Sequence, residues 1–257
     1  MSGDTPGSRA TRVAALMIGR GGSSLQDKNI LPVHGVPLLL WSAAAARRSR
    51  YVRRFYASSD CERILATAAL AGYAPIARPP ELATATAQSS DAVRHAFEII
   101  ERDGPIDVLV VQHANVGTIS EQQIDACIEL LLAHDKATAV VPAHQYPDYH
   151  PMRARRLRAD GILEPFVDEA GMSANRQDLP PAYFFDHSFW VLRGRQAIFD
   201  PHGQRPWPCM GSHILPYETQ GCRDVHDHAD LEMTAQWLVE NAIPRPVFLP
   251  SAPSLAI

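Results

Sequence analysis

Short apolar and β-branched runs alternate with helix-like segments from residue 13 to residue 141. The runs at 13–18 and 108–112 are almost wholly apolar, which is typical of strands buried on both faces of a parallel sheet. The pattern predicts strands at 13–18, 51–58, 108–112 and 137–141, and helices at 37–48, 61–70, 91–102 and from Ser120 onward. Because strands that alternate with helices are joined by right-handed crossovers, we expect an α/β fold with a mostly parallel sheet.

The pattern changes between residues 142 and 179, where prolines, arginines and tyrosines crowd a segment with little periodicity. A turn signal at residues 159–161 predicts a hairpin, and we expect residues 142–182 to form an inserted arm that reaches a second subunit. A return strand is expected at 183–192 and a closing helix at 229–241. Residues 1–12 are small, polar and basic and are expected to form a disordered leader to a single domain at 13–257.

The charge balance argues against one broad class of function. The chain carries 24 Lys and Arg against 28 Asp and Glu, a net charge of −4, whereas non-specific nucleic-acid binders carry a large basic excess. No apolar run approaches the ~20 residues that cross a membrane. The four cysteines lie far apart in the sequence, which favours reduced thiols and a cytoplasmic protein: Cys61, Cys127, Cys209 and Cys222.

A glycine-rich turn follows the first strand and is the first candidate site. Its small residues would let backbone N–H groups turn toward an anion: Gly19, Gly21, Gly22 and Ser23. Arg20 and Lys28 add positive charge. The turn lacks the Gly-Lys pair of a Walker A loop, and Ser24 replaces the third glycine of a dinucleotide fingerprint. Taken alone, these residues are equally compatible with an anion-binding loop and with a flexible connection whose charges are solvated.

Further motifs, in a fixed order along the chain, are more specific than the turn. They are Arg20-Gly21-Gly22-Ser23 with Lys28-Asn29-Ile30, Ser58-Ser59-Asp60, Arg78-Pro79-Pro80-Glu81-Leu82-Ala83, Thr86-Ala87-Gln88-Ser89 with Asp91 and His95, and Asn175-Arg176-Gln177-Asp178-Leu179-Pro180-Pro181. With these motifs the chain resembles, over nearly its full length, the cytidylyltransferases that activate acidic nine-carbon sugars: the CMP-sialic, pseudaminic and legionaminic acid synthetases. The resemblance implies a Rossmann-like nucleotidyltransferase fold, a three-layer sandwich whose arm builds a homodimer.

The resemblance also implies a reaction in which CTP and an acidic acceptor give a CMP conjugate and pyrophosphate, assisted by Mg²⁺. Arg20 and Lys28 would be catalytic, because they would hold the CTP phosphates and offset charge as pyrophosphate leaves. The resemblance implies nucleotide binding by Gly19, Gly21, Gly22, Ser23, Asn29, Arg78 and Ser89. Gln112, at the end of the central strand, would face the acceptor. Arg176 would meet the anionic group of the acceptor, because a planar guanidinium binds carboxylate or phosphonate in a bidentate manner. An ion pair between Arg176 and Asp178 is the alternative role for that arginine.

Two departures from the family pattern concern the loop and the acceptor pocket. The phosphate loop is one residue shorter, and Ser24 stands where the family usually has lysine. After the central strand only Gln112 of the family's segment remains, and His113 and Asn115 occupy positions expected to contact a smaller, more anionic acceptor. A polar loop without ligand contacts is the alternative for both residues.

A third departure affects the expected metal site. The family's D-x-D before the last helix becomes Asp224 and His226, with Asp227 next in the chain. Carboxylate oxygens suit Mg²⁺, whereas imidazole is an unusual ligand for so hard an ion. We expect Asp224 to be a ligand, accompanied by His226 or Asp227. A zinc site that adds Cys222 and His213 is the alternative, although the histidines lack recognised zinc spacing.

These departures favour a change of substrate, because a pocket rejects ligands that leave its polar groups unpaired. The acceptor is expected to be either a nonulosonic acid sugar or a phosphonate, such as phosphonoformate in an antibiotic or other natural-product pathway. The competing hypothesis is a catalytically inactive nucleotide-binding or scaffold homologue. Neither nucleic acid nor a membrane is an expected partner.

Overall fold

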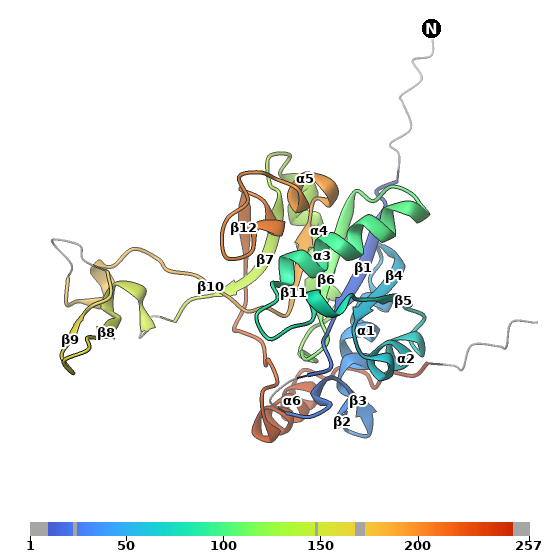
Figure 1. Ribbon diagram of the computed structural model, residues 1–257, viewed down its shortest axis with the longest axis horizontal. Helices are drawn as coiled ribbons and strands as arrows, with labels where there is room; N and C mark the ends of the chain where they lie inside the picture. The colour runs from blue at the N-terminus through green and yellow to red at the C-terminus, as the bar shows by residue number, and fades with distance from the viewer. Residues whose placement is uncertain (1–9, 23–24, 147–148, 168–172, 249–257) are drawn as a thin grey trace, which may run out of the picture.

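The computed structural model describes residues 10–22, 25–146, 149–167 and 173–248 (Figure 1). The strands are β1 (Val13–Ile18), β2 (Pro32–Val33), β3 (Val36–Pro37), β4 (Val52–Ser59), β5 (Ala74–Ala77), β6 (Val108–His113), β7 (Ala139–His144), β8 (Arg155–Leu157), β9 (Leu163–Pro165), β10 (Phe184–Phe185), β11 (Phe189–Leu192) and β12 (Ile214–Glu218). The α-helices are α1 (Leu38–Arg48), α2 (Glu62–Ala69), α3 (Ser89–Ile100), α4 (Glu121–Ala133), α5 (Gly194–Ile198) and α6 (His228–Glu240). Short 3-10 turns are η1 (Lys28–Ile30), η2 (Pro80–Leu82), η3 (Glu101–Asp103), η5 (Pro151–Arg153), η6 (Arg176–Asp178) and η7 (Pro208–Met210).

One sheet organises the chain, in the order β10-β7-β11-β6-β1-β4-β5, with β12 also paired to β7. β1 runs parallel to both β4 and β6, and β4 runs parallel to β5. β11 is inserted antiparallel between β6 and β7. The expected α/β fold with a mostly parallel, Rossmann-like sheet is therefore confirmed.

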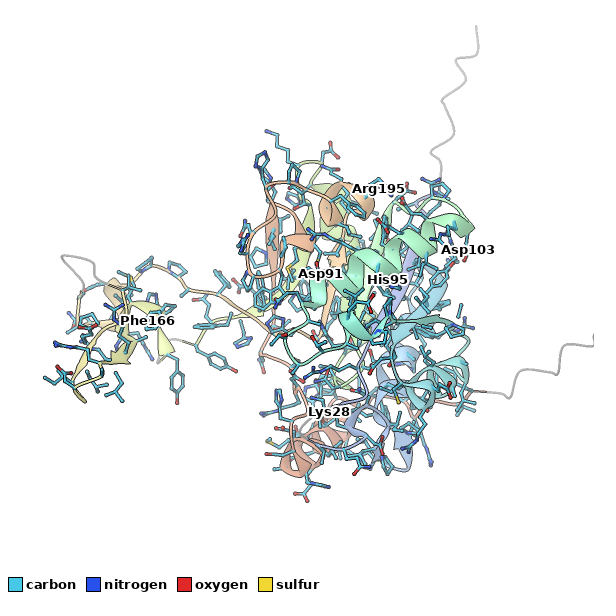
Figure 2. All side chains as sticks on the ribbon, viewed as in Figure 1. Lys28, Asp91, His95, Asp103, Phe166 and Arg195 are labelled. Atoms are coloured by element: carbon cyan, nitrogen blue, oxygen red, sulfur yellow. The ribbon has the colours of Figure 1, made fainter. Side chains whose placement is uncertain are left out.

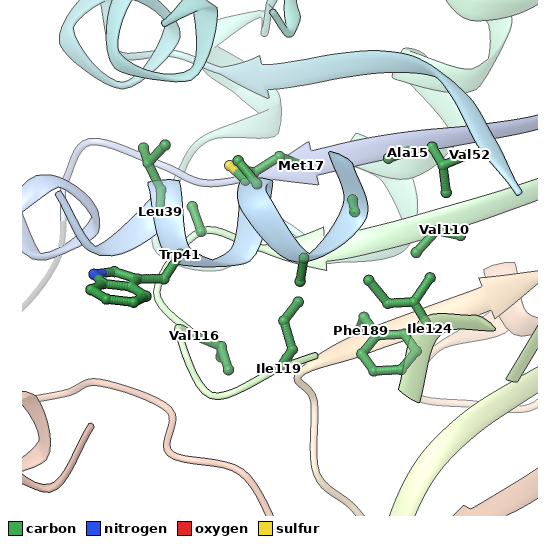
Figure 3. Packing of buried hydrophobic residues seen from close by; sticks show 14 of the residues in the cluster. Ala15, Met17, Leu39, Trp41, Val52, Val110, Val116, Ile119, Ile124 and Phe189 are labelled. Carbon is green, nitrogen blue, oxygen red and sulfur yellow. The ribbon is translucent and has the colours of Figure 1, made fainter. Parts of the chain in front are cut away.

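Alternation along β1 builds two separate cores on the two faces of the sheet. Val13, Ala15 and Met17 pack with residues of α1, α2 and α4, which include Leu39 and Ile124 (Figure 3). The intervening side chains pack on the opposite face with residues of α3 and α5: Ala14, Leu16 and Ile18. Because successive strand residues point to opposite faces, a wholly apolar strand requires helices on both sides. The result is the expected three-layer sandwich.

Local signals account for where the helices begin. Ser120 caps α4: its Oγ accepts the backbone N–H of Gln123, and the Gln123 side chain accepts the Ser120 N–H in return. This reciprocal pair satisfies N–H groups that have no partner within the helix. Asp227 and Asp230 form the same capping box at the start of α6. Both helices lie where the sequence predicts them.

The expected strand at 183–192 is two strands, β10 and β11, separated by residues 186–188. The pattern did not predict β5, β12, α5 or the β2–β3 hairpin. At the N-terminus, residues 1–9 of the expected leader lie outside the described residues. Arg12 belongs to the folded domain, because its backbone N–H and its Nε both donate to Asp107 Oδ2 at 2.8 Å.

The expected hairpin within residues 142–182 is present. β8 and β9 pair antiparallel, with Arg155 opposite Pro165 and Leu157 opposite Leu163. This segment projects from the sheet as an arm, and Figure 2 places Phe166 on it, away from Lys28 in the body. Among the described residues, no helix combines the length and the apolar character needed to span a bilayer.

Candidate active site

A pocket of about 570 Å³ opens beside the carboxyl ends of β1 and β6. From β1 the chain crosses to β4 on one side, whereas β6 pairs with β1 on the other, so the strand order reverses here. Ligands of open α/β sheets bind at such a reversal. Nine predicted residues line the pocket: Gly19, Arg20, Lys28, Asn29, Arg78, Ser89, His113, Asn115 and His226.

The glycine turn approaches other chain segments closely. A Cβ on Gly19 would lie 2.8 Å from the Cβ of Ala114, so any side chain here would push the turn away from β6. The buried Asn29 donates its Nδ2 to the Arg20 carbonyl at 3.1 Å, and the Gly21 N–H donates to Asp60 Oδ1 at 3.0 Å. The Asp60 carboxylate therefore accepts a hydrogen bond from the Gly21 N–H, the kind of backbone donor with which an anion-binding loop holds a phosphate.

Three cationic side chains converge on the pocket from three different segments. Arg20 Nη1 donates to the carbonyl of Thr84 at 2.7 Å, and Lys28 Nζ donates to the carbonyl of Val225 at 2.9 Å. Arg78 is only 9% exposed and donates to both Oγ and O of Ser58, at 3.2 and 2.7 Å. Burial lowers the pKa of Arg78, but a guanidinium starts so high that it stays charged at neutral pH. The pocket thus concentrates positive charge beside a backbone turn, as a polyphosphate requires.

Gln112 does not face this pocket, contrary to the sequence-based expectation. It is fully buried in the α1 face of the sheet, where its Oε1 accepts the Tyr73 hydroxyl at 2.7 Å. Its Nε2 donates to the carbonyl and the hydroxyl of Ser42, at 2.7 and 2.9 Å. His113 is the next residue along β6 and therefore points to the α3 face, where it lines the pocket.

The residues expected to form the metal site lie around Asp224. Asn115 Nδ2 donates to Asp224 Oδ1, and His226 Nε2 lies 3.3 Å from Asp224 Oδ2. Burial raises the pKa of Asp224, and the neighbouring His226 and Lys28 oppose that shift. Asp227 instead accepts the Asp230 N–H as the cap of α6, so it is committed to the helix rather than to an ion.

One carboxylate beside a cationic pocket fits a hard cation that takes most of its oxygen ligands from substrate phosphates and water. It does not fit a cage made by the protein alone. Within the described ranges, no three His, Cys, Asp or Glu side chains gather closely enough to hold a metal. This finding gives no support to the zinc alternative that involves Cys222 and His213.

Two further predicted residues, Gly22 and Arg176, are not among the residues that line the pocket. Gly22 is exposed, and Ser23 lies outside the described residues. Arg176 is exposed in η6 on the arm and is not a lining residue within one chain. The neighbouring Asp178 accepts hydrogen bonds from Ser173 Oγ, at 2.7 Å, and from Asn175 Nδ2, and these bonds hold the pKa of its carboxyl below its usual range.

The structure adds residues to which sequence reasoning assigned no role. The loop before α3 lines the pocket through Thr84, Ala85 and Gln88, and part of it belongs to the Thr86–Ser89 motif. Asp60 closes the glycine turn, and the Ser58-Ser59-Asp60 motif could have signalled it. His187, whose ring lies beside that of the pocket-lining His113, carries no sequence signal at all.

Comparisons with known proteins agree with this geometry. The sequence profile of a family described as Cytidylyltransferase matches residues 14–193. A pseudaminic acid cytidylyltransferase from Campylobacter jejuni is 28% identical over 191 residues, 71% of this chain and 81% of that protein. N-acylneuraminate cytidylyltransferase A from Danio rerio is 29% identical over 141 residues, 54% of this chain, and the match spans only 32% of that longer protein.

Solved structures share the fold at low identity. CMP:2-keto-3-deoxy-manno-octonic acid synthetase complexed with CTP superposes with a TM-score of 0.65 at 13% identity, covering 90% of this chain and 100% of that one. A 4-diphosphocytidyl-2C-methyl-D-erythritol synthase from Anaerococcus prevotii gives a TM-score of 0.62 at 10% identity, with the same coverage. The profile match covers well over half of the chain, and the fold is that of CTP-using nucleotidyltransferases. This chain therefore belongs to the cytidylyltransferase family.

Proposed function

We propose that this protein transfers CMP from CTP to a small acidic acceptor and releases pyrophosphate. The observation that carries this proposal is the convergence of Arg20, Lys28 and Arg78 on one pocket beside the Gly19 turn. Family membership and the fold shared with a CTP-complexed synthetase support CTP as the nucleotide. The acceptor is either a nonulosonic acid sugar, as the names of the curated relatives suggest, or a phosphonate.

The chemistry needs no covalent bond to the protein. An ionised acceptor oxygen attacks the α-phosphorus in line, a new P–O bond forms, and the bond to the bridging oxygen of pyrophosphate breaks. Arg20 and Lys28 offset the charge that develops on the departing oxygens, and the backbone turn holds the chain of phosphates in register. Positioning and charge neutralisation therefore supply most of the rate acceleration.

Mg²⁺ would complete this charge balance by binding phosphate oxygens. Asp224 would hold it, since its carboxylate lies next to both Asn115 and His226 at the pocket. Asn115 keeps one carboxylate oxygen oriented, and the other oxygen faces the His226 ring. The remaining ligands would come from substrate and water, as is usual for Mg²⁺ in phosphoryl-transfer sites.

We also propose a homodimer built by the arm. Four large apolar side chains on the arm are more than half exposed in one chain: Leu157, Ile162, Leu163 and Phe166. Exposed apolar clusters of this kind mark protein–protein contacts. A second copy would cover them and would carry its own Arg176 toward the acceptor end of the first copy's pocket.

The test separates an enzyme from a catalytically inactive scaffold. Calorimetry with CTP, in the presence and absence of Mg²⁺, measures binding, and a pyrophosphate-release assay with N-acetylneuraminic acid and phosphonoformate measures transfer. The proposal predicts tight, Mg²⁺-dependent CTP binding together with release for one of the two acceptors. CTP binding without release across a broad set of acidic acceptors would favour the scaffold, and absence of CTP binding would refute both readings.

A further inference from the structure

A short turn at residues 186–188 separates β10 from β11, which both pair with β7, and its His187 ring lies near that of the pocket-lining His113. Asp186, 7% exposed, accepts the Ser188 N–H at 3.1 Å and the Ser188 hydroxyl at 2.6 Å on one carboxylate oxygen. Its other oxygen accepts the Thr219 hydroxyl at 2.8 Å. A buried carboxylate bonded at both oxygens is costly to move, so it fixes the conformation of residues 186–188.

The residue at the centre of this turn, His187, has a φ of 52°, in the left-handed region that disfavours residues with a side chain. His34 has a similar φ of 49°, but it begins the two-residue turn of the β2–β3 hairpin, where such angles are expected. His187 lies in no such hairpin. A strained residue held in place by buried hydrogen bonds at the edge of a binding pocket points to a functional role.

The His187 ring belongs to a wall of aromatic rings behind the pocket-lining His113; Trp190 and Trp207 of this wall are not lining residues themselves. The centroid of the His187 ring lies 4.5 Å from that of Trp207, 6.2 Å from that of Trp190 and 6.3 Å from that of His113. His113 itself lies edge-on to Trp190, with the ring centroids 4.7 Å apart. Since His113 lines the pocket and His187 lies against it, His187 limits the orientations that the His113 ring can adopt.

Two polar atoms in this wall have no partner within the described part of the chain. They are His113 Nδ1 and Trp190 Nε1, both buried, in rings that touch each other. Burial lowers the pKa of His113 to about 4, so its imidazole is neutral at neutral pH and offers one donor and one acceptor. Buried polar groups are costly when unsatisfied, and His113 is the one of these two residues that lines the pocket, so a polar ligand atom is expected beside the His113 ring.

We propose that His113 contacts the oxyanion of the acceptor and that His187 is the residue that positions His113. This inference rests on the proposed cytidylyl transfer.

The test uses His187→Gly, because glycine adopts the same backbone angles without strain and the variant is expected to fold. His34→Gly is the matched control, with the same change at nearly the same φ on a turn outside the pocket lining. The full-length protein is saturated with the non-hydrolysable analogue α,β-methylene-CTP, and phosphonoformate is then titrated by calorimetry as the oxyanion probe. Long-range ¹H–¹⁵N spectra report the tautomer of His113, which a purely structural role for His187 would leave unchanged.

The wild type and His34→Gly are expected to bind phosphonoformate with the same affinity. His187→Gly is expected to bind phosphonoformate about 10-fold more weakly, the range for one hydrogen bond to a charged group, with unchanged nucleotide affinity and a shifted His113 tautomer. Unchanged phosphonoformate affinity in His187→Gly would overturn the positioning role. No phosphonoformate binding by a wild type that binds the nucleotide would overturn the contact of His113 with this oxyanion and leave the proposed transfer standing. A wild type that fails to bind the nucleotide would refute the proposed function itself.

Discussion

Replacing Gln112 with methionine distinguishes a buried structural role from a role in acceptor binding. The glutamine side chain makes three hydrogen bonds, one with the Tyr73 hydroxyl and two with Ser42, and it is inaccessible to solvent. Methionine has a similar length and would fill the space without making these bonds. Each bond contributes about 1 kcal/mol net, and a stranded Tyr73 hydroxyl adds about 1 kcal/mol more.

We therefore expect Gln112→Met to lower the free energy of unfolding by about 4 kcal/mol, measured by urea denaturation followed by circular dichroism. For a chain of this size the melting temperature should fall by about 10 °C. The KM for the acceptor should not change at temperatures where the variant is folded, because the side chain lies on the face of the sheet opposite the pocket. An unchanged unfolding free energy with a raised acceptor KM would refute this reasoning.

A double-mutant cycle with Tyr73→Phe provides the control. If the Tyr73 hydroxyl and Gln112 bind each other, the double variant should be less destabilised than the sum of the two single variants, by about 1 kcal/mol. Tyr73 is itself buried, and that burial raises the pKa of its phenol, so the hydroxyl stays protonated and remains a donor. Strictly additive effects would mean that the two side chains do not interact.

Three further outcomes are expected. Lys28→Ala should reduce kcat for CMP transfer by about 10²–10³-fold while the melting temperature stays near that of the wild type; the exposed Lys136→Ala is the control, and equal turnover in the two variants would remove Lys28 from the mechanism. His113 has a folded pKa of about 4, below the ~6.5 of an unfolded histidine, so the unfolded state binds more protons between these values, and stability should fall by about 2 kcal/mol as the pH drops from 6.5 to 4. Urea midpoints should show this loss in the wild type and a smaller one in His113→Asn; parallel curves would contradict it. Phe166→Glu on the arm should halve the mass measured by ultracentrifugation, whereas the similarly exposed Val239→Glu on α6 should not; a wild type that sediments as a monomer would refute the proposed homodimer.

Much of the fold could be predicted from the sequence because its signals are local. The apolar run of β1, the Ser120 cap and the helix patterns depend on neighbouring residues, so they appear in the sequence as they do in the structure. β12 and the β10–β11 break were not predictable in this way. β12 is short and half-exposed, and its pairing with β7 depends on residues about 75 positions earlier in the chain.

The candidate site shows the same division. Motif order in the sequence placed Arg20, Lys28 and Arg78 in one site, and the pocket contains all three. The sequence did not reveal which of two adjacent residues at the end of β6 faces that pocket. Alternation requires Gln112 and His113 to point to opposite faces, but only the packing of α1 against one face decides which side chain is buried.

The sequence by itself therefore determined the alternation of elements, the glycine-rich turn and the family, because each depends on residues close together along the chain or in a fixed order. Only the tertiary structure decided that Gln112 belongs to the core and that His187 lies beside His113. The physical reason is that these roles depend on partners distant in sequence. Polar side chains bond with whichever groups folding brings within reach.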